Sequence, residues 1–177
     1  MHRRSLLKGF LPAALLSGPA VLYAETYLTV EQARQLMLPG TSLTQAFVTL
    51  TAAQKSAITK ASGVRVRDVQ VKAWRSPKGE WFIADNVVGK HEFIDFAVAL
   101  TKDGAVKSVE IMTYRETYGS EVRNPKWRAQ FGGKKAGAPV KIDQDIMNIS
   151  GATLSSVHIT EGVRRLLHTW AIALNHP

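Results

Sequence analysis

Trp81-Phe82-Ile83-Ala84-Asp85-Asn86-Val87-Val88 is the stretch that decides the fold, because it is a largely apolar run of strand length that follows a tight turn at Ser76-Pro77-Lys78-Gly79. Residues 91–100 form a second, mostly apolar run, and residues 105–114 form a third after the turn at Lys102-Asp103-Gly104. The turns recur at about ten-residue spacing. The pattern predicts a meander of antiparallel strands.

The segment before this meander alternates between apolar and polar residues, which is typical of a strand with one exposed face. Residues 64–67 alternate, and residues 69–72 alternate again after a slip of one residue. Such a slip indicates a bulge or a break in the strand. Farther upstream, residues 47–50 are expected to form a short strand or an extended linker.

Two short helices are predicted near the N-terminus from the spacing of the capping box, in which Ser or Thr is followed three residues later by Glu or Gln. Thr29-Val30-Glu31-Gln32 begins a helix that runs to about Leu38. Thr51-Ala52-Ala53-Gln54 begins a second helix that runs to about Ala61, with Gly63 as a left-handed terminator. We expect residues 25–63 to form an N-terminal helical cover.

The strongest helical pattern lies near the C-terminus, over residues 155–174. Its apolar side chains recur at three- and four-residue spacing and form a continuous stripe that should pack on the sheet. They are Ile159, Val163, Leu166, Leu167, Trp170, Ala171 and Leu174. A shorter helix is expected after Asn124-Pro125 and places Trp127 and Phe131 on one face.

Together these patterns predict the α+β class: an antiparallel sheet with helices on one side and a long C-terminal helix. Residues 64–177 are expected to form one domain, since the chain shows no internal repeat.

Residues 1–24 are predicted to be an export signal. Arg3-Arg4-Ser5-Leu6-Leu7-Lys8 resembles a twin-arginine signal, and residues 9–24 are moderately apolar and free of charge. Two prolines interrupt this segment, which is too short and broken for a membrane span of about 20 apolar residues. Cleavage is expected after Ala24. The alternatives are a plain secretory signal and an uncleaved anchor, and all three place the domain in the periplasm or on the outer face of the inner membrane.

Charge and cysteine content exclude several classes of function. The net charge is +9, but three of the 23 cations lie in the first ten residues and the rest are scattered, so a solvated surface is favoured over a nucleic-acid interface. The chain has no cysteine, which excludes disulfides, thiolate zinc sites, iron–sulfur clusters and haem attached through Cys. An exported redox protein of this composition needs an organic cofactor or a His/Met metal site.

Asn148-Ile149-Ser150-Gly151-Ala152-Thr153-Leu154-Ser155-Ser156 brings four hydroxyls and a glycine to the expected entrance of the C-terminal helix. The first N–H groups of a helix lack internal partners, and the helix dipole is positive there. The loop therefore suits a phosphate. The simpler alternative is an ordinary N-cap, in which Ser150 or Ser155 satisfies the helix N–H groups.

Other chemistry is poorly supported by the sequence. His158 and His168 are ten residues apart, unlike the i, i+4 pair of a metal-binding helix, and no carboxylate completes a ligand set. Ser155 and Ser156 precede His158, but neighbours in sequence do not form a catalytic triad and a Gly-x-Ser-x-Gly elbow is absent. Gly132-Gly133-Lys134 lacks the spacing of a Walker loop.

Ser150-Gly151-Ala152-Thr153-Leu154-Ser155 resembles the Ser/Thr-Gly-Ala-Thr-x-Ser/Thr signature of the FMN-binding domain family, which includes the flavin subunits of the Na⁺-pumping NADH:quinone reductase and of the Rnf complex. In that family a flavin transferase uses Mg²⁺ and FAD to join FMN to the threonine by a phosphoester bond. The resemblance implies that Thr153 is the attachment residue here. Glu116-Thr117-Tyr118-Gly119 also resembles the Glu-Thr-Pro-Gly loop of the family, and Trp127 lies in a segment that resembles its next helix. The likeness covers residues 87–174.

Two positions depart from the family pattern. The family often has Asp three residues before the Ser of the signature, where this chain has Met147, with Asp145 two residues earlier. Either the transferase accepts this change, or Asp145 serves through a shifted loop. Tyr118 replaces the proline of the family.

The resemblance implies an exported flavoprotein that passes electrons between a membrane redox partner and an acceptor outside the cytoplasm. The implied FMN-binding residues are Thr153, Ser150, Gly151, Ala152, Leu154, Ser155, Glu116, Thr117, Tyr118, Gly119 and Trp127. The implied partners are the flavin transferase and a membrane-bound redox protein, with peripheral association at the membrane. A periplasmic reductase that acts directly on a small substrate, and a flavin-free binding or scaffold domain, are the alternatives.

Overall fold

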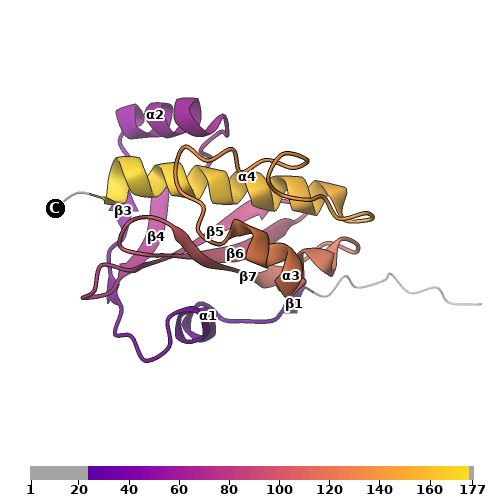
Figure 1. Cartoon of the computed structure of the whole chain (residues 1–177), viewed down its shortest axis with the longest axis horizontal. Coiled ribbons are helices and arrows are strands. Elements are labelled where there is room, and N and C mark those ends of the chain that lie inside the picture. The colour runs from indigo at the N-terminus through magenta and orange to yellow at the C-terminus, as the bar shows by residue number, and fades with distance from the viewer. Residues whose placement is uncertain (1–23, 176–177) are drawn as a thin grey trace, which may run out of the picture.

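The computed structural model describes residues 24–175 of the chain. Its centre is a seven-stranded antiparallel sheet with the order β1-β7-β6-β5-β4-β2, and β3 pairs with β4 off this path (Figure 1). The strands are β1 (Glu25–Thr26), β2 (Thr44–Gln45), β3 (Val48–Thr49), β4 (Gln70–Arg75), β5 (Trp81–Val88), β6 (Phe93–Leu100) and β7 (Val106–Tyr114). The predicted α+β class and the antiparallel meander are confirmed.

The strand before the meander is shorter than its alternating pattern predicts. β4 begins only at Gln70, whose backbone N–H donates to the Oδ1 of Asp68 at 2.8 Å. Residues 64–67 are therefore outside the sheet, and the slip in the pattern marks a break. Residues 47–50 contain the short strand β3.

Both faces of the central strands are buried, which is why the strands appear in the sequence as nearly continuous apolar runs. On one face, Ile83 and Val98 belong to the larger core with the long C-terminal helix. On the opposite face, Phe82 and Ala97 pack in a second cluster with Ala33 of the first helix. The expectation of helices on one side is therefore wrong, because the second face is also apolar and needs a cover.

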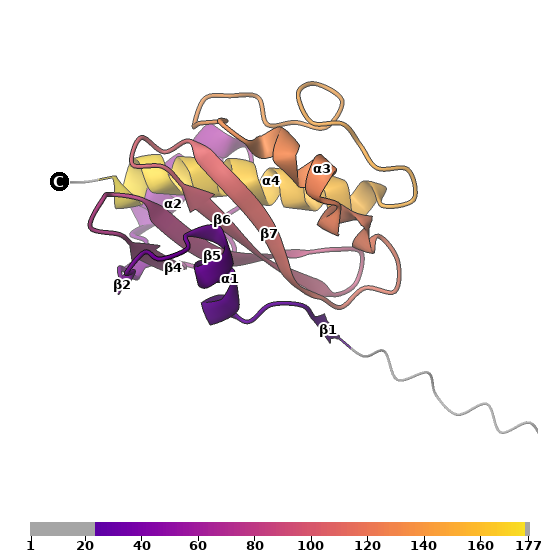
Figure 2. The same ribbon diagram turned by 60° about the horizontal axis from the view of Figure 1, so that its bottom comes forward.

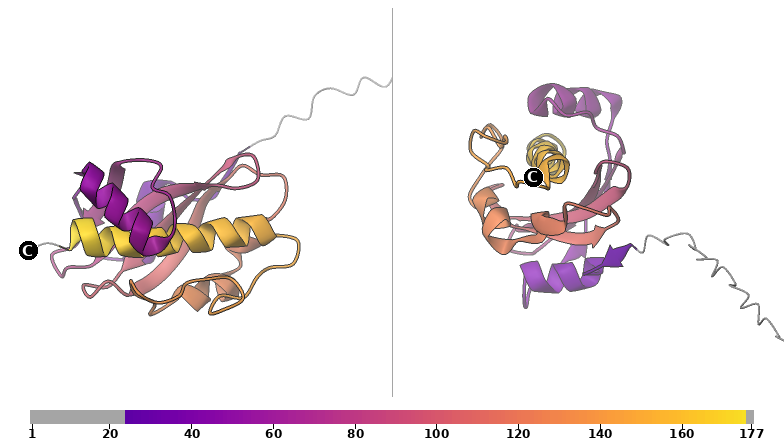
Figure 3. Two further views of the ribbon diagram at one scale, coloured as in Figure 1. Left: turned by 90° about the horizontal axis from the view of Figure 1, so that it is seen from above. Right: turned by 90° about the vertical axis from the view of Figure 1, so that its right-hand side faces the viewer.

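The first two helices lie on opposite sides of the sheet. α1 (Val30–Met37) and α2 (Ala52–Ser62) each begin with the predicted capping box, at Thr29 and Thr51. The right-hand view of Figure 3 shows the order of layers: α2, then the C-terminal helix, then the sheet, then α1. Residues 25–63 thus contribute a helix to each side.

The long C-terminal helix, α4 (Thr153–Thr169), crosses the sheet and continues as a π-helical turn over Trp170–Leu174. The short helix α3 (Pro125–Arg128) begins at the predicted cap Asn124. Figure 2 shows that the start of α4, α3 and the loop after β7 lie at the same end of the molecule. This end holds the hydroxyl-rich loop.

The predicted export signal, residues 1–24, falls outside the described residues except for Ala24. Between residues 24 and 175, no helix is both long enough and apolar enough to cross a bilayer.

Candidate functional site

Thr153 is the first residue of α4, and it is exposed. The N-cap is Ala152, which is buried and has no side-chain oxygen, so no side chain caps this helix. The alternative in which Ser150 or Ser155 caps the helix is therefore wrong. The N–H groups of the first turn are left for solvent or for an anion.

The turn before α4 depends on Gly151. Its φ is +86°, a conformation that L side chains rarely adopt, although no atom would obstruct an added Cβ within 4 Å. The N–H of Ala152 donates to the carbonyl of Ile149 at 3.0 Å and closes the turn. The turn holds Ser150 and Thr153 on the surface while Ala152 points into the protein.

The serines that follow Thr153 are occupied by internal hydrogen bonds. The Tyr114 hydroxyl donates to the carbonyl of Tyr118 at 2.5 Å, so the Ser155 hydroxyl, 2.8 Å from it, is the donor in their shared bond. The Ser156 hydroxyl donates to the carbonyl of Ala152 at 2.8 Å. Of the four hydroxyls, only those of Ser150 and Thr153 belong to exposed residues.

Tyr114 therefore joins the two loops that resemble the family. It lies at the end of β7, and its hydroxyl contacts α4 through Ser155 and the 116–119 loop through Tyr118. Burial raises the pKa of Tyr114 further than the hydrogen bond with Ser155 lowers it, so the phenol stays protonated near neutral pH. Sequence reasoning did not identify this residue, because an aromatic residue at the end of an apolar strand is typical of a core.

Gly119 makes the close approach of these groups sterically allowed. Its φ is +96°, and a Cβ would lie 2.6 Å from the Tyr114 hydroxyl oxygen and 2.7 Å from that of Ser155. Thr117 and Tyr118 are exposed on the same loop, and Tyr118 is 83% exposed. The structure thus places the 116–119 loop beside the first turn of α4.

Glu116 faces the turn between β5 and β6. Its Oε1 accepts from the backbone N–H of His91 at 2.5 Å and of Glu92 at 2.9 Å. Burial opposes ionisation, but hydrogen bonds from the backbone of Glu92, His91 and Lys90 outweigh it, so the pKa of Glu116 is lowered. In this structure Glu116 therefore anchors the loop, and its role in binding FMN stays a prediction.

The lowered pKa of Glu116 predicts a loss of stability in acid. A depressed folded pKa contributes stability above the unfolded value of about 4.5, and this contribution is lost as the pH falls through the folded pKa. Urea unfolding between neutral pH and about pH 3 should show this loss, and Glu116→Gln should make the dependence shallower. An unchanged pH dependence in Glu116→Gln would contradict the assignment.

Trp127 supports the segment that precedes the attachment loop. The ring is buried, packs edge-on against Phe131 at 5.2 Å between centroids, and donates from Nε1 to the carbonyl of Met147 at 2.7 Å. The N–H of Met147 in turn donates to the Gln130 side chain at 2.8 Å. A direct role for Trp127 as a wall of the flavin site stays a prediction.

Asp145 is already bound by three donors. Its carboxylate accepts from Lys134 Nζ at 2.9 Å and from the backbone N–H groups of Val140 at 3.1 Å and Lys141 at 2.8 Å. Although burial opposes ionisation, these contacts lower the pKa of Asp145. Met147 is 73% exposed, so an apolar side chain lies where the family often has an acid. The alternative in which Asp145 serves through a shifted loop therefore gains no support from this arrangement.

Asp145→Asn is expected to lower the free energy of unfolding by about 1–3 kcal/mol, since the partly buried carboxylate that accepts from Lys134 loses its charge and one acceptor oxygen. FMN loading of the folded variant should be unchanged. Urea unfolding and the intact mass of the loaded protein measure the two effects separately. A folded variant that gains no FMN would show instead that Asp145 serves the transferase.

The segment that contains both loops is similar to known proteins. Residues 89–168 match the family model of the FMN-binding domain, and the match includes both loops and Thr153. One subunit of the Na(+)-translocating NADH-quinone reductase of Vibrio vulnificus (strain YJ016) is 37% identical over 92 residues, covering 41% of this chain and 34% of the relative. The corresponding subunit of the Vibrio anguillarum reductase is 36% identical with the same coverage.

The chain spans about a third of the length of these curated relatives. Over residues 89–168, this chain is similar to the FMN-binding domain family.

Proposed function

We propose that this chain is an exported flavoprotein that holds FMN on Thr153 by a phosphoester bond and passes electrons between a membrane redox partner and an acceptor outside the cytoplasm. The observation that supports this most directly is the placement of Thr153. It is an exposed hydroxyl on the first residue of a helix without a side-chain cap, within the segment that matches the family.

The chemistry of attachment fits these residues. The Thr153 oxygen would form a bond to the FMN phosphorus of FAD, the pyrophosphate bond would break, AMP would leave, and the threonine would lose its proton. The phosphodiester that results keeps one negative charge beside the free N–H groups of α4. Ser155 is buried and bonded to Tyr114, so it does not compete for the modification.

The surface near Thr153 favours an electron carrier. Leu154 is 46% exposed beside the attachment residue, and Tyr118 is 83% exposed on the adjoining loop. Exposed apolar side chains of this size provide contacts for a flavin ring or for a docking protein. When bound, the flavin supplies the electron transfer, and the chain supplies the attachment and position.

The names of the relatives and the N-terminal sequence support the proposed partners and location. The relatives are named as subunits of an NADH-quinone reductase that translocates Na⁺. For this chain we infer a membrane-bound redox partner and modification by a flavin transferase that uses FAD and Mg²⁺. A twin-arginine signal in residues 1–24 would bring the domain to the periplasm or to the outer face of the inner membrane.

Intact mass of the full chain, co-expressed with a flavin transferase, tests this function. The expected gain is one FMN minus one water, and flavin fluorescence should remain with the protein after denaturation. Flavin that is released by denaturation would indicate non-covalent binding. No flavin in either state would overturn the proposal.

A further inference from the structure

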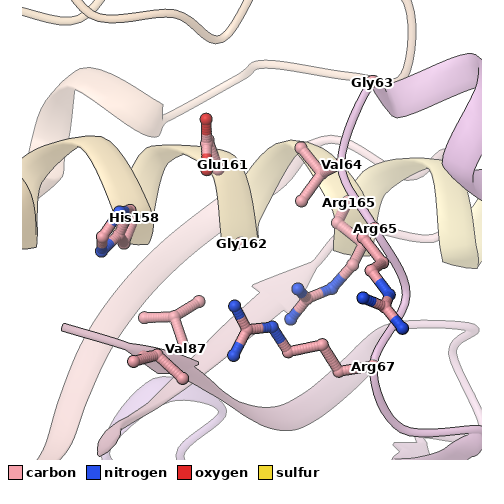
Figure 4. A pocket seen from close by; sticks show the side chains of 10 residues that line it. Gly63, Val64, Arg65, Arg67, Val87, His158, Glu161, Gly162 and Arg165 are labelled. Atoms are coloured by element: carbon pink, nitrogen blue, oxygen red, sulfur yellow. The ribbon is translucent and has the colours of Figure 1, made fainter. Parts of the chain in front are cut away.

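A second site lies on another part of α4, away from the attachment loop. Figure 4 shows a pocket between α4, β5 and the segment that links α2 to β4. Its volume is about 260 Å³. Since one water molecule accounts for ~30 Å³ in the liquid, the pocket has room for a small organic molecule.

Three arginines line this pocket. Figure 4 shows the side chains of Arg65 and Arg67 on the segment that links α2 to β4, and that of Arg165 on α4. Arg165 is fixed, because its guanidinium donates to Asp85 at 2.7 Å and to the carbonyl of Asn86 at 3.2 Å. Within residues 24–175, Arg65 and Arg67 have no hydrogen bond or ion pair through their side chains.

The charges of the pocket remain unbalanced. Glu161 is the acid among the lining residues, and Asp85 is engaged by Arg165. Two free guanidiniums that lie near a third repel one another and favour an anion between them. Guanidinium groups match carboxylates particularly well, since their planar forks form paired hydrogen bonds.

The other walls of the pocket fit a carbon chain and a second polar group. Val64, Val87 and Val88 supply an apolar side. His158 also lines the pocket, and the Nδ1 of its imidazole has no hydrogen-bond partner among the described residues. A single inorganic oxyanion would leave the apolar wall and the imidazole without contacts.

We propose that this pocket binds a small organic carboxylate, with a carboxylate at Arg65 and Arg67, carbon atoms against the valines and a second polar group toward His158. The site is separate from the attachment residue, because Thr153 does not line it and precedes His158 by five residues. The proposed contacts use no atom of the flavin, so the carboxylate is expected to bind without it.

Succinate titration of the full chain, followed by amide NMR shifts, tests the site. Saturable shifts are expected at Gly63, Val87 and Gly162, which line the pocket, with a Kd of about 1 mM or tighter. Arg65→Gln and Arg67→Gln should each weaken binding by about tenfold, since each removes a charge-assisted contact. Lys78→Gln removes one exposed positive charge from a turn outside the pocket and should leave the Kd unchanged.

Two controls distinguish this site from flavin attachment, and an organic carboxylate from an inorganic anion. Thr153→Val, which should contain no attached flavin, is expected to bind succinate with the same Kd, so failure of flavin attachment leaves this site testable. Inorganic phosphate should bind at least about tenfold more weakly than succinate. The proposal is overturned if succinate at ~10 mM causes no saturable shifts, if Arg67→Gln binds as tightly as the parent, or if phosphate binds as tightly as succinate.

Discussion

Thr153→Val is expected to abolish the covalent gain of FMN. Valine has nearly the shape of threonine but lacks the oxygen that forms the phosphoester, so the fold should persist while attachment is lost. The residue is exposed at the start of α4, and its hydroxyl makes no hydrogen bond with any described residue. Intact mass after co-expression with a flavin transferase should show the unmodified chain alone.

Two matched variants decide how this loss is interpreted. Thr44→Val removes an exposed hydroxyl from β2, outside the loops that resemble the family, and should leave the mass gain intact. Thr153→Ser keeps a hydroxyl at the attachment position and should retain some FMN. A full mass gain in Thr153→Val would identify another attachment residue. Ser150, which is exposed in the turn before α4, would be tested next.

Local signals predicted much of the fold. The turns and apolar runs located β5, β6 and β7 within about two residues, and the two capping boxes located α1 and α2. The position of α1 could not be predicted in this way. A run such as Trp81 to Val88 shows that both faces of a strand are apolar, but it does not identify which helix covers each face.

The candidate site was only partly predictable, because contacts between segments that are distant in the sequence also determine it. The sequence identified the hydroxyls at the start of the long helix but could not distinguish Thr153 from Ser155 by local chemistry. That distinction depends on Tyr114, which lies 41 residues before Ser155 and occupies its hydroxyl. Glu116 and Trp127 were recognised by resemblance, but their hydrogen bonds to backbone groups depend on tertiary structure.

Gly119→Ala is expected to destabilise the protein and to disrupt the junction between the two loops. The added Cβ would lie 2.6 Å from the Tyr114 hydroxyl oxygen and 2.7 Å from that of Ser155, and the φ of +96° adds backbone strain. A loss of about 2–4 kcal/mol in the free energy of unfolding is expected from strain and overpacking together. Urea unfolding measures this loss, and intact mass should show slower FMN loading in the same variant.

Gly133→Ala is the matched control, because Gly133 also has a positive φ, of +76°, but no atom lies within 4 Å of the added Cβ. Gly133→Ala should lower the free energy of unfolding by about 1 kcal/mol, from backbone strain alone. The difference between the two losses in unfolding free energy measures how much the close packing of Gly119 against Tyr114 and Ser155 contributes. If both variants lose the same stability and load FMN at the same rate, Tyr114 does not couple the 116–119 loop to the start of α4, and the attachment site depends on the 150–153 turn alone.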